Sequence, residues 1–340
     1  MNSDSLADLP QFWMGGVLAR DLLQVSDDPA CLGDGGFWAI STTYEGDFRA
    51  AKFASISTSE FPQSSSKIEA SSSKPKISGK WESDTSQSEY MQYVEKIREE
   101  IANGGVYQVN ACRRLSIEST SPLDLAFANI LSANPAPFAS YLKFGDIEIA
   151  SASPELFLIR NGDEIKTSPI KGTKRSATEK FGTKDRAENV MIVDLMRNDI
   201  GQICIAGSIA VPDLLRDEEH PGLSHLVSDV TGKLRDGISW PEIFAALLPA
   251  GSISGAPKSA AKRIIAENEQ TPRSTYCGVL GWVHGDEALL SVAIRTFWRE
   301  AEFIHFGTGA GITWNSDASA EWEETQLKAE RLISIVGGEL

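Results

Sequence analysis

Residues 106 to 173 contain a series of short strand-like runs, and this series constrains the fold more than any other part of the sequence. VYQVNACRRLSIE (106–118) alternates polar and apolar side chains, and segment 138–173 continues as successive strands with a turn at Asn161-Gly162. Asn-Gly between two alternating runs is a strong β-hairpin signal. Because strands joined by tight hairpins pair antiparallel, these residues predict a large antiparallel sheet.

Helical segments interrupt the strands at several places in the sequence. Apolar residues recur every three or four positions over 90–101, and an Asn-Gly-Gly turn at 103–105 ends that helix. A strongly apolar helix is predicted over 187–200, and a closing helix over 319–336. Further helices and strands alternate between them. This interleaving favours the α+β class, with large, mainly antiparallel sheets.

Composition divides the chain into three parts. Residues 1–56 carry short apolar runs broken by glycine, which is typical of a small antiparallel sheet. Residues 57–88 are rich in Ser, Lys, Pro and Gln and contain SSSK twice, so they predict a linker or a long exposed loop. Residues 89–340 hold the remaining helices and strands, and we expect them to form one domain.

Charge and hydropathy exclude two classes of partner. The 340 residues include 32 Lys and Arg against 47 Asp and Glu, a net charge of −15 that is spread along the chain. Nucleic-acid binding is not expected, because it needs a basic face. No apolar run approaches the ~20 residues that span a bilayer, and the N-terminal residues lack the pattern of a secretory signal. We therefore expect a cytoplasmic protein that does not contact a membrane.

A metal site in this chain would depend on carboxylates. The four cysteines and four histidines are dispersed without the spacing of a zinc site or a disulfide framework, so a hard ion such as Mg²⁺ is favoured. The closing helix carries Glu321, Glu324, Lys328 and Arg331 on one face. Such a stripe is usually a solvated face. Here it follows the glycine-rich segment 306–318, whose backbone N–H groups are able to converge on an anion, and a divalent cation would bridge the two.

Neither glycine-rich segment of the chain matches a nucleotide-binding loop. Segment 306–312 has the spacing GxGxG and is not followed at once by a helix of small residues. Segment 250–259 separates its glycine and lysine by two residues, whereas the Walker pattern needs them adjacent. A sharp turn before a helix remains, and there Ser252 and Ser254 are able to donate to an oxygen-rich ligand.

Three further residues are candidates only when they are considered together. Glu188 lies near the start of the apolar helix and is placed to face a pocket, whereas Asp194 and Arg197 on the same helix are expected to pair structurally. Lys171 and Glu155 taken singly are an ordinary loop lysine and an ordinary strand-end carboxylate.

Nine segments occur in the order seen in the chorismate-utilising enzymes: SASPELF, PIKGT, KDRAENVMIVDLMRNDIG, HLVSDVTG, GSISGAPK, YCGVLGW, AIRTF, GTGAGI and EWEET. The chain resembles this family from about Ser88 to its last residue, and within the family it resembles component I of the aminodeoxychorismate synthases. The resemblance implies that residues 89–340 form the chorismate-binding catalytic domain. The resemblance implies an anthranilate synthase component I-like fold, in which antiparallel sheets form a sandwich core with helices outside.

Two positions separate the reactions of this family. Isochorismate and salicylate synthases have a lysine base where this chain has Gln108, and anthranilate synthases typically have PIAGT where this chain has PIKGT. Lys171 therefore resembles the lysine that attacks C2 of chorismate as the C4 hydroxyl leaves, with Glu155 as its proton donor. Ammonia then attacks C4, and the product is 4-amino-4-deoxychorismate. Anthranilate synthase component I and a non-catalytic chorismate-binding protein are the alternatives, and the presence of both Glu155 and Lys171 argues against the second.

The resemblance also implies a set of ligand-binding residues and a partner. An amidotransferase partner is implied because the chain lacks the Cys-His-Glu arrangement that hydrolyses glutamine. The N-terminal region is shorter than in full-length relatives, so tight tryptophan binding is not expected. The implied metal ligands for Mg²⁺ are Glu188, Glu321 and Glu324, and the implied substrate-binding residues are Arg295, Tyr276, His225, Ser254, Gly309, Ala310, Gly311 and Lys328.

Overall fold

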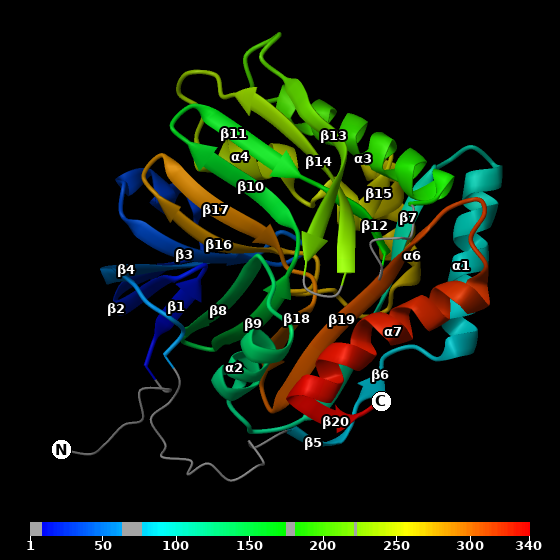
Figure 1. Cartoon of the computed structure of the whole chain (residues 1–340), viewed down its shortest axis with the longest axis horizontal. Helices are drawn as coiled ribbons and strands as arrows, with labels where there is room; N and C mark the ends of the chain where they lie inside the picture. Colours follow the sequence, from blue (N-terminus) through cyan, green and yellow to red (C-terminus); the bar gives the residue numbers. More distant parts are fainter. Residues whose placement is uncertain (1–8, 63–76, 175–180, 221–222) are drawn as a thin grey trace.

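The structure, a computed structural model, describes residues 9–62, 77–174, 181–220 and 223–340. Helices separate runs of consecutive strands along the chain (Figure 1). The helices are η2 (Pro29–Asp34, a 3₁₀ helix), α1 (Gln87–Ala102), α2 (Leu123–Ala133), α3 (Thr183–Gly201), α4 (Trp240–Leu247), α5 (Gly251–Ser254), α6 (Lys258–Asn268) and α7 (Ala318–Val336).

The strands are β1 (Gln11–Met14), β2 (Val17–Ser26), β3 (Phe37–Thr42), β4 (Phe48–Thr58), β5 (Ile77–Lys80), β6 (Glu82–Ser83), β7 (Gln108–Glu118), β8 (Phe138–Phe144), β9 (Ile147–Ser153), β10 (Leu156–Asn161), β11 (Glu164–Ser168), β12 (Ile170–Lys174), β13 (Ala210–His220), β14 (Leu223–Lys233), β15 (Gly255–Ala256), β16 (Val279–His284), β17 (Glu287–Val292), β18 (Thr296–Glu300), β19 (Phe303–Ile312) and β20 (Gly337–Glu339).

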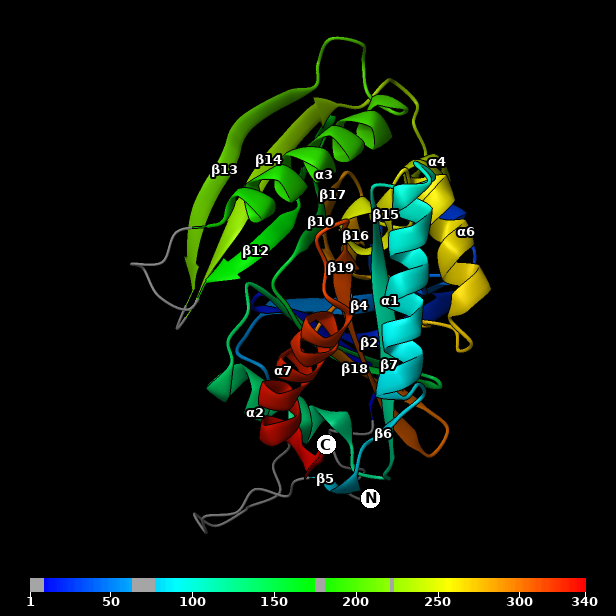
Figure 2. The same ribbon diagram turned by 90° about the vertical axis from the view of Figure 1, so that its right-hand side faces the viewer.

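Eighteen of the described strands join into one continuous antiparallel sheet. From β13 the sheet passes through β14, then β11 and β12, then β10, β17, β16, β3, β4, β2, β1, β8, β9, β18 and β19 to β7. The sheet curls, so that β12 and β14 face the region of β19 and α7 (Figure 2). The predicted α+β class with antiparallel pairing is confirmed, and the strands form one curled sheet.

The early strands are part of this same sheet. Strand β1 pairs with β8, and β3 pairs with β16, so residues 9–58 are hydrogen-bonded into the sheet formed by later residues. Within the predicted linker 57–88, residues 63–76 lie outside the described residues. On their C-terminal side, β5 pairs in parallel with β20, and β6 pairs with β7.

Local signals set the ends of the predicted helices. Helix α1 begins with a capping box in which the Ser86 hydroxyl accepts from the Glu89 N–H (3.3 Å) and the Glu89 carboxylate accepts from the Ser86 N–H (2.8 Å). Helix α3 begins four residues earlier than the predicted 187, because the Asp185 carboxylate caps the Gly182 N–H (2.9 Å). No helix in the described part of the chain is long and apolar enough to cross a membrane.

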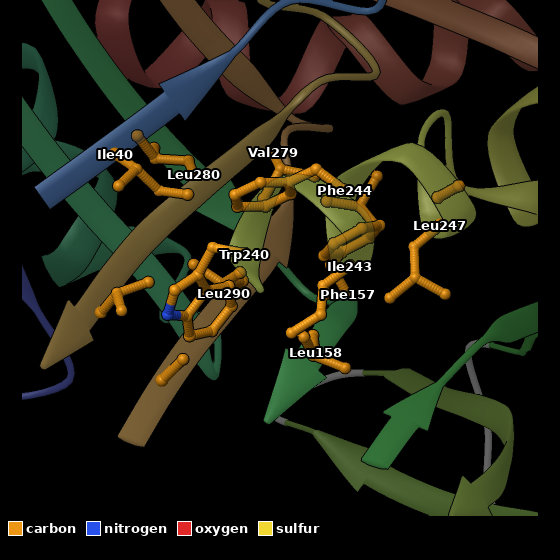
Figure 3. Packing of buried hydrophobic residues seen from close by; sticks show 14 of the residues in the cluster. Ile40, Phe157, Leu158, Trp240, Ile243, Phe244, Leu247, Val279, Leu280 and Leu290 are labelled. Atoms are coloured by element: carbon orange, nitrogen blue, oxygen red, sulfur yellow. The ribbon is translucent and has the colours of Figure 1, made fainter. Parts of the chain in front are cut away.

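A large apolar core joins the sheet to α4. Trp240, Ile243 and Phe244 from α4 pack against Leu158 and Leu290 of the sheet (Figure 3). Two smaller cores lie under four other helices: one packs α2 and α7 on β9 and β18, and the other packs α1 and α6 on β7 and β19. These cores hold α7 against β19 and α1 against β7 and β19, whereas α3 packs on β14.

Replacement of Gly278 with alanine is expected to destabilise the fold by about 1–3 kcal/mol, the usual cost of overpacking. A Cβ at this position would lie 1.8 Å from the Thr42 carbonyl oxygen, at the point where β16 meets β3. Urea unfolding measures the difference. Gly33→Ala is the control, because a Cβ there meets nothing within 4 Å, and equal stability of the two variants would contradict the prediction.

Candidate active site

A cavity of about 610 Å³ lies between β12, β19, α3 and α7. It is polar on several sides, and its walls come from segments that are far apart in the sequence. Eleven of the thirteen predicted site residues line it: Glu155, Lys171, Glu188, His225, Tyr276, Arg295, Gly309, Gly311, Glu321, Glu324 and Lys328.

The other two predicted residues, Ser254 and Ala310, are not among those that line the cavity. The Ser254 side chain is fully buried, and its hydroxyl donates to the Ala250 carbonyl oxygen (3.0 Å). Ala310 belongs to the core that packs α1 and α6 on the sheet, with Tyr90 among its members. Ser252, two residues before Ser254, faces the cavity instead.

Lys171 lies on β12 next to a bulge that directs its side chain into the cavity. The register of β12 against β14 shifts after Lys171, and Gly172 there has a φ of +78°, a conformation that glycine adopts easily. A Cβ on Gly172 would lie 3.0 Å from the side chain of Asp185 on α3. The bulge therefore fits closely against α3, and the Lys171 Nζ donates to the Ser252 carbonyl oxygen (2.9 Å).

Burial favours the neutral forms of Lys171 and Glu155. Desolvation lowers the pKa of Lys171, although the nearby Glu188 and Glu155 carboxylates oppose the shift. Desolvation likewise raises the pKa of Glu155, although a hydrogen bond from Ser252 and the charge of Lys171 oppose it. A neutral amine is a nucleophile and a protonated carboxyl is a proton donor, so the pair is suited to covalent catalysis with acid assistance.

Carboxylates from α3 and α7 also line the cavity. The Glu188 Oε2 accepts a hydrogen bond from Gln108 Nε2 (3.0 Å), and burial raises the pKa of Glu188. Glu324 pairs with Lys328 (2.6 Å); burial opposes its ionisation, but Lys328 and more distant lysines outweigh that effect and lower its pKa. Glu321 is buried and lies on the same face of α7 as Glu324.

The oxygen atoms of these carboxylates are suited to bind a hard divalent cation. The Glu188 Oε1 is a buried atom with no hydrogen-bond partner, and a cation already lies beside it: the Lys184 ammonium is 3.8 Å from Glu188 Oε1 and 3.6 Å from Glu321 Oε1. Anionic oxygens of this kind are the ligands that Mg²⁺ prefers. Within the described residues, no three acidic, histidine or cysteine side chains are already gathered closely enough to hold a metal ion.

Cationic groups in the same cavity suit an anionic ligand. Arg295 is largely buried, has a φ of +53°, and makes no side-chain hydrogen bond or ion pair within the described part of the chain. Burial, and then the charge of Arg331, lower its pKa. An uncompensated buried guanidinium is costly, so it favours a carboxylate ligand. Lys328 also donates to the Gly309 carbonyl oxygen (2.9 Å).

Tyr276 separates this cavity from a smaller one of about 270 Å³. The ring of Tyr276 lies on Gly307, where a Cβ would come within 2.0 Å of it. In the smaller cavity the acidic residue Glu269 is already paired with Arg273 (2.6 Å). The larger cavity is therefore the better candidate site.

Lys184 is the main site residue that the sequence analysis missed. It lies four residues before Glu188 on the same helix, and this i, i+4 spacing was the available signal. By contrast, the expected structural pair is confirmed, because Arg197 donates to Asp194 (3.1 Å) on the exposed side of α3.

A model of the chorismate binding enzyme family matches residues 38–334, so the chain belongs to this family. It is 38% identical to anthranilate synthase component 1 1 of Haloarcula marismortui over 268 residues, which are 75% of this chain and 55% of that protein. It is 36% identical to aminodeoxychorismate synthase component 1 of Escherichia coli over 269 residues, which are 76% of this chain and 59% of that protein. The chain thus spans little more than half the length of these relatives.

The fold agrees with this family. The crystal structure of anthranilate synthase component I from Streptococcus pneumoniae superposes with a TM-score of 0.79 and covers 95% of this chain and 92% of its own, at 24% sequence identity. The expected anthranilate synthase component I-like fold is therefore confirmed.

Proposed function

We propose that this chain is an aminodeoxychorismate synthase that converts chorismate and ammonia to 4-amino-4-deoxychorismate. The observation that carries the proposal is the position of Lys171, a buried amine beside Glu155 in the cavity that holds the predicted carboxylates and Arg295. Similarity to the Escherichia coli protein supports the same reaction. The product is an intermediate for para-aminobenzoate, and so for folate synthesis.

In the proposed reaction Lys171 is the nucleophile and Glu155 the acid. The neutral Lys171 amine forms a bond to C2 of chorismate, the two conjugated ring double bonds each move by one position, and the C4 hydroxyl leaves as water with a proton from Glu155. Ammonia then attacks C4, the two double bonds move back, and the Lys171–C2 bond breaks to restore the free amine. Glu155 recovers its proton from the new C4 ammonium group. Arg295 would hold a substrate carboxylate during both steps.

The carboxylates of α3 and α7 would hold Mg²⁺ in this proposal. Glu188, Glu321 and Glu324 supply anionic oxygens, and the ion would neutralise a substrate carboxylate next to them. Gln108 supports the choice of an amination rather than a hydroxylation, because its amide nitrogen is engaged by Glu188 and does not act as a base. The ammonia would come from a separate glutamine amidotransferase.

Anthranilate synthesis is the second candidate, and it rests on the 38% identity to the Haloarcula marismortui protein. The two reactions differ in the carbon that receives nitrogen, so the product distinguishes them. The experiment is incubation of the purified chain with chorismate, Mg²⁺ and an ammonium salt, followed by chromatography of the products. A 4-amino product supports the proposal, and a 2-amino product or anthranilate supports the alternative.

The pH dependence of kcat/KM is expected to be bell-shaped, with both breaks moved toward neutrality. The active form needs protonated Glu155 and neutral Lys171. Because burial raises the pKa of Glu155 and lowers that of Lys171, the acid-side break should lie above the usual range of a glutamate, and the base-side break below that of a lysine. Initial rates across pH at low chorismate measure both breaks. Breaks at the ordinary values of solvated side chains would contradict the assignment.

A further inference from the structure

We propose that Lys184 is a built-in competitor for the divalent cation: its ammonium occupies the place between Glu188 and Glu321 and swings out when Mg²⁺ enters. The inference rests on the magnesium site of the proposed function and assigns a role to a residue outside that site's predicted ligands.

The Lys184 ammonium lies within ion-pair distance of two carboxylates. Its distances of 3.8 Å to Glu188 and 3.6 Å to Glu321 are those of an ion pair, and both exceed a normal N–H···O hydrogen bond. The two carboxylate oxygens belong to different helices, α3 and α7. Lys184 is thus a cation that bridges the two helices and is held by charge without tight hydrogen bonds.

The two carboxylates and the lysine differ in their exposure to water. The side chains of Glu188 and Glu321 are 16% and 7% exposed, so they need a positive charge beside them. The Lys184 side chain is 47% exposed and is attached in the first turn of α3, so its flexible stem is able to move the ammonium into water. The carboxylates remain in place while the lysine leaves.

The positive charges of Lys184 and of a divalent cation repel each other at this place. A divalent cation added beside a lysine that stayed in place would repel it strongly at such short range. Binding of Mg²⁺ therefore requires displacement of the Lys184 ammonium. The free energy of the two Lys184 ion pairs is lost in this exchange, so Mg²⁺ binds more weakly than it would without the lysine. Before Mg²⁺ binds, the same lysine prevents repulsion between Glu188 and Glu321.

The test measures Mg²⁺ binding by calorimetry without chorismate or ammonia. Lys184→Met is expected to bind Mg²⁺ about threefold to tenfold more tightly than the wild type, because two partly exposed ion pairs no longer compete. Lys184→Arg keeps the charge and should stay within about twofold of the wild type. Lys233→Met is the matched control, since Lys233 is 52% exposed and lies 3.8 Å from Glu164, outside the cavity.

A second readout follows the lysine itself. Mass-spectrometric labelling of amines in the wild-type protein should show a higher reactivity of Lys184 after Mg²⁺ is added. Unchanged or weaker Mg²⁺ binding by Lys184→Met, or tightening of the Lys184→Arg variant to the same degree, would overturn the inference. Absence of Mg²⁺ binding in every variant would also overturn it, whereas the product assay would still test the proposed reaction separately.

Discussion

Replacement of Lys171 with alanine is expected to slow turnover by about 100-fold or more and to move the amino group of the product from C4 to C2. The amine is buried beside Glu155 and Glu188, and it would occupy C2 transiently. Without it, C2 is open to ammonia. The expected loss in rate is the size that follows removal of one positioned catalytic group.

Chromatography of the product decides between this role and that of an ordinary loop residue. Lys166→Ala is the control, because Lys166 lies on β11, pairs with Asp229 (3.8 Å) and does not line the cavity. A damaged fold would lower the rate without changing the product. Unaltered 4-amino product at the wild-type rate would remove the covalent role of Lys171.

Replacement of Glu324 with glutamine is expected to abolish the Mg²⁺-dependent activity, a loss of about 100-fold or more. A neutral amide keeps the shape of the side chain but weakens the proposed site for a hard cation, and removal of a proposed direct ligand should cost more than the 10–100-fold typical of outer partners. Glu321→Gln should behave in the same way. Both side chains line the cavity, from the same face of α7.

The measurements are initial rates over a range of Mg²⁺ concentrations and the thermal unfolding temperature. Glu323→Gln is the control on the same helix, since Glu323 is exposed and is not part of the cavity wall. Full turnover by Glu324→Gln, or by the wild type in excess chelator, would contradict the metal assignment. A large drop in unfolding temperature would instead show that Glu324 supports the fold.

Local sequence signals fixed the helices and hairpins of this protein. The Asn161-Gly162 turn joins β10 to β11 as predicted, and the closing helix begins within one residue of its expected start. Both depend on neighbouring residues: a glycine with positive φ in the turn, and an Asp317 side chain that accepts from the Ala320 N–H (2.9 Å). Interactions of such short range are encoded by adjacent residues.

Only the tertiary structure decided which candidates share one cavity. Lys171 and Glu188 lie on β12 and α3, and the closing helix carries Glu321, so the curl of the sheet and the packing of both helices were needed to bring them together. The same packing turned the Ser254 hydroxyl toward a backbone carbonyl.

The sequence by itself determined the family pattern, the α+β class and the residue types available for chemistry. The tertiary structure decided that Lys171 and Glu155 are buried, that Arg295 lacks a partner among the described residues, and that Lys184 bridges two carboxylates. The physical reason is that desolvation and charge pairing depend on what surrounds a side chain in space, and those neighbours come from distant parts of the chain.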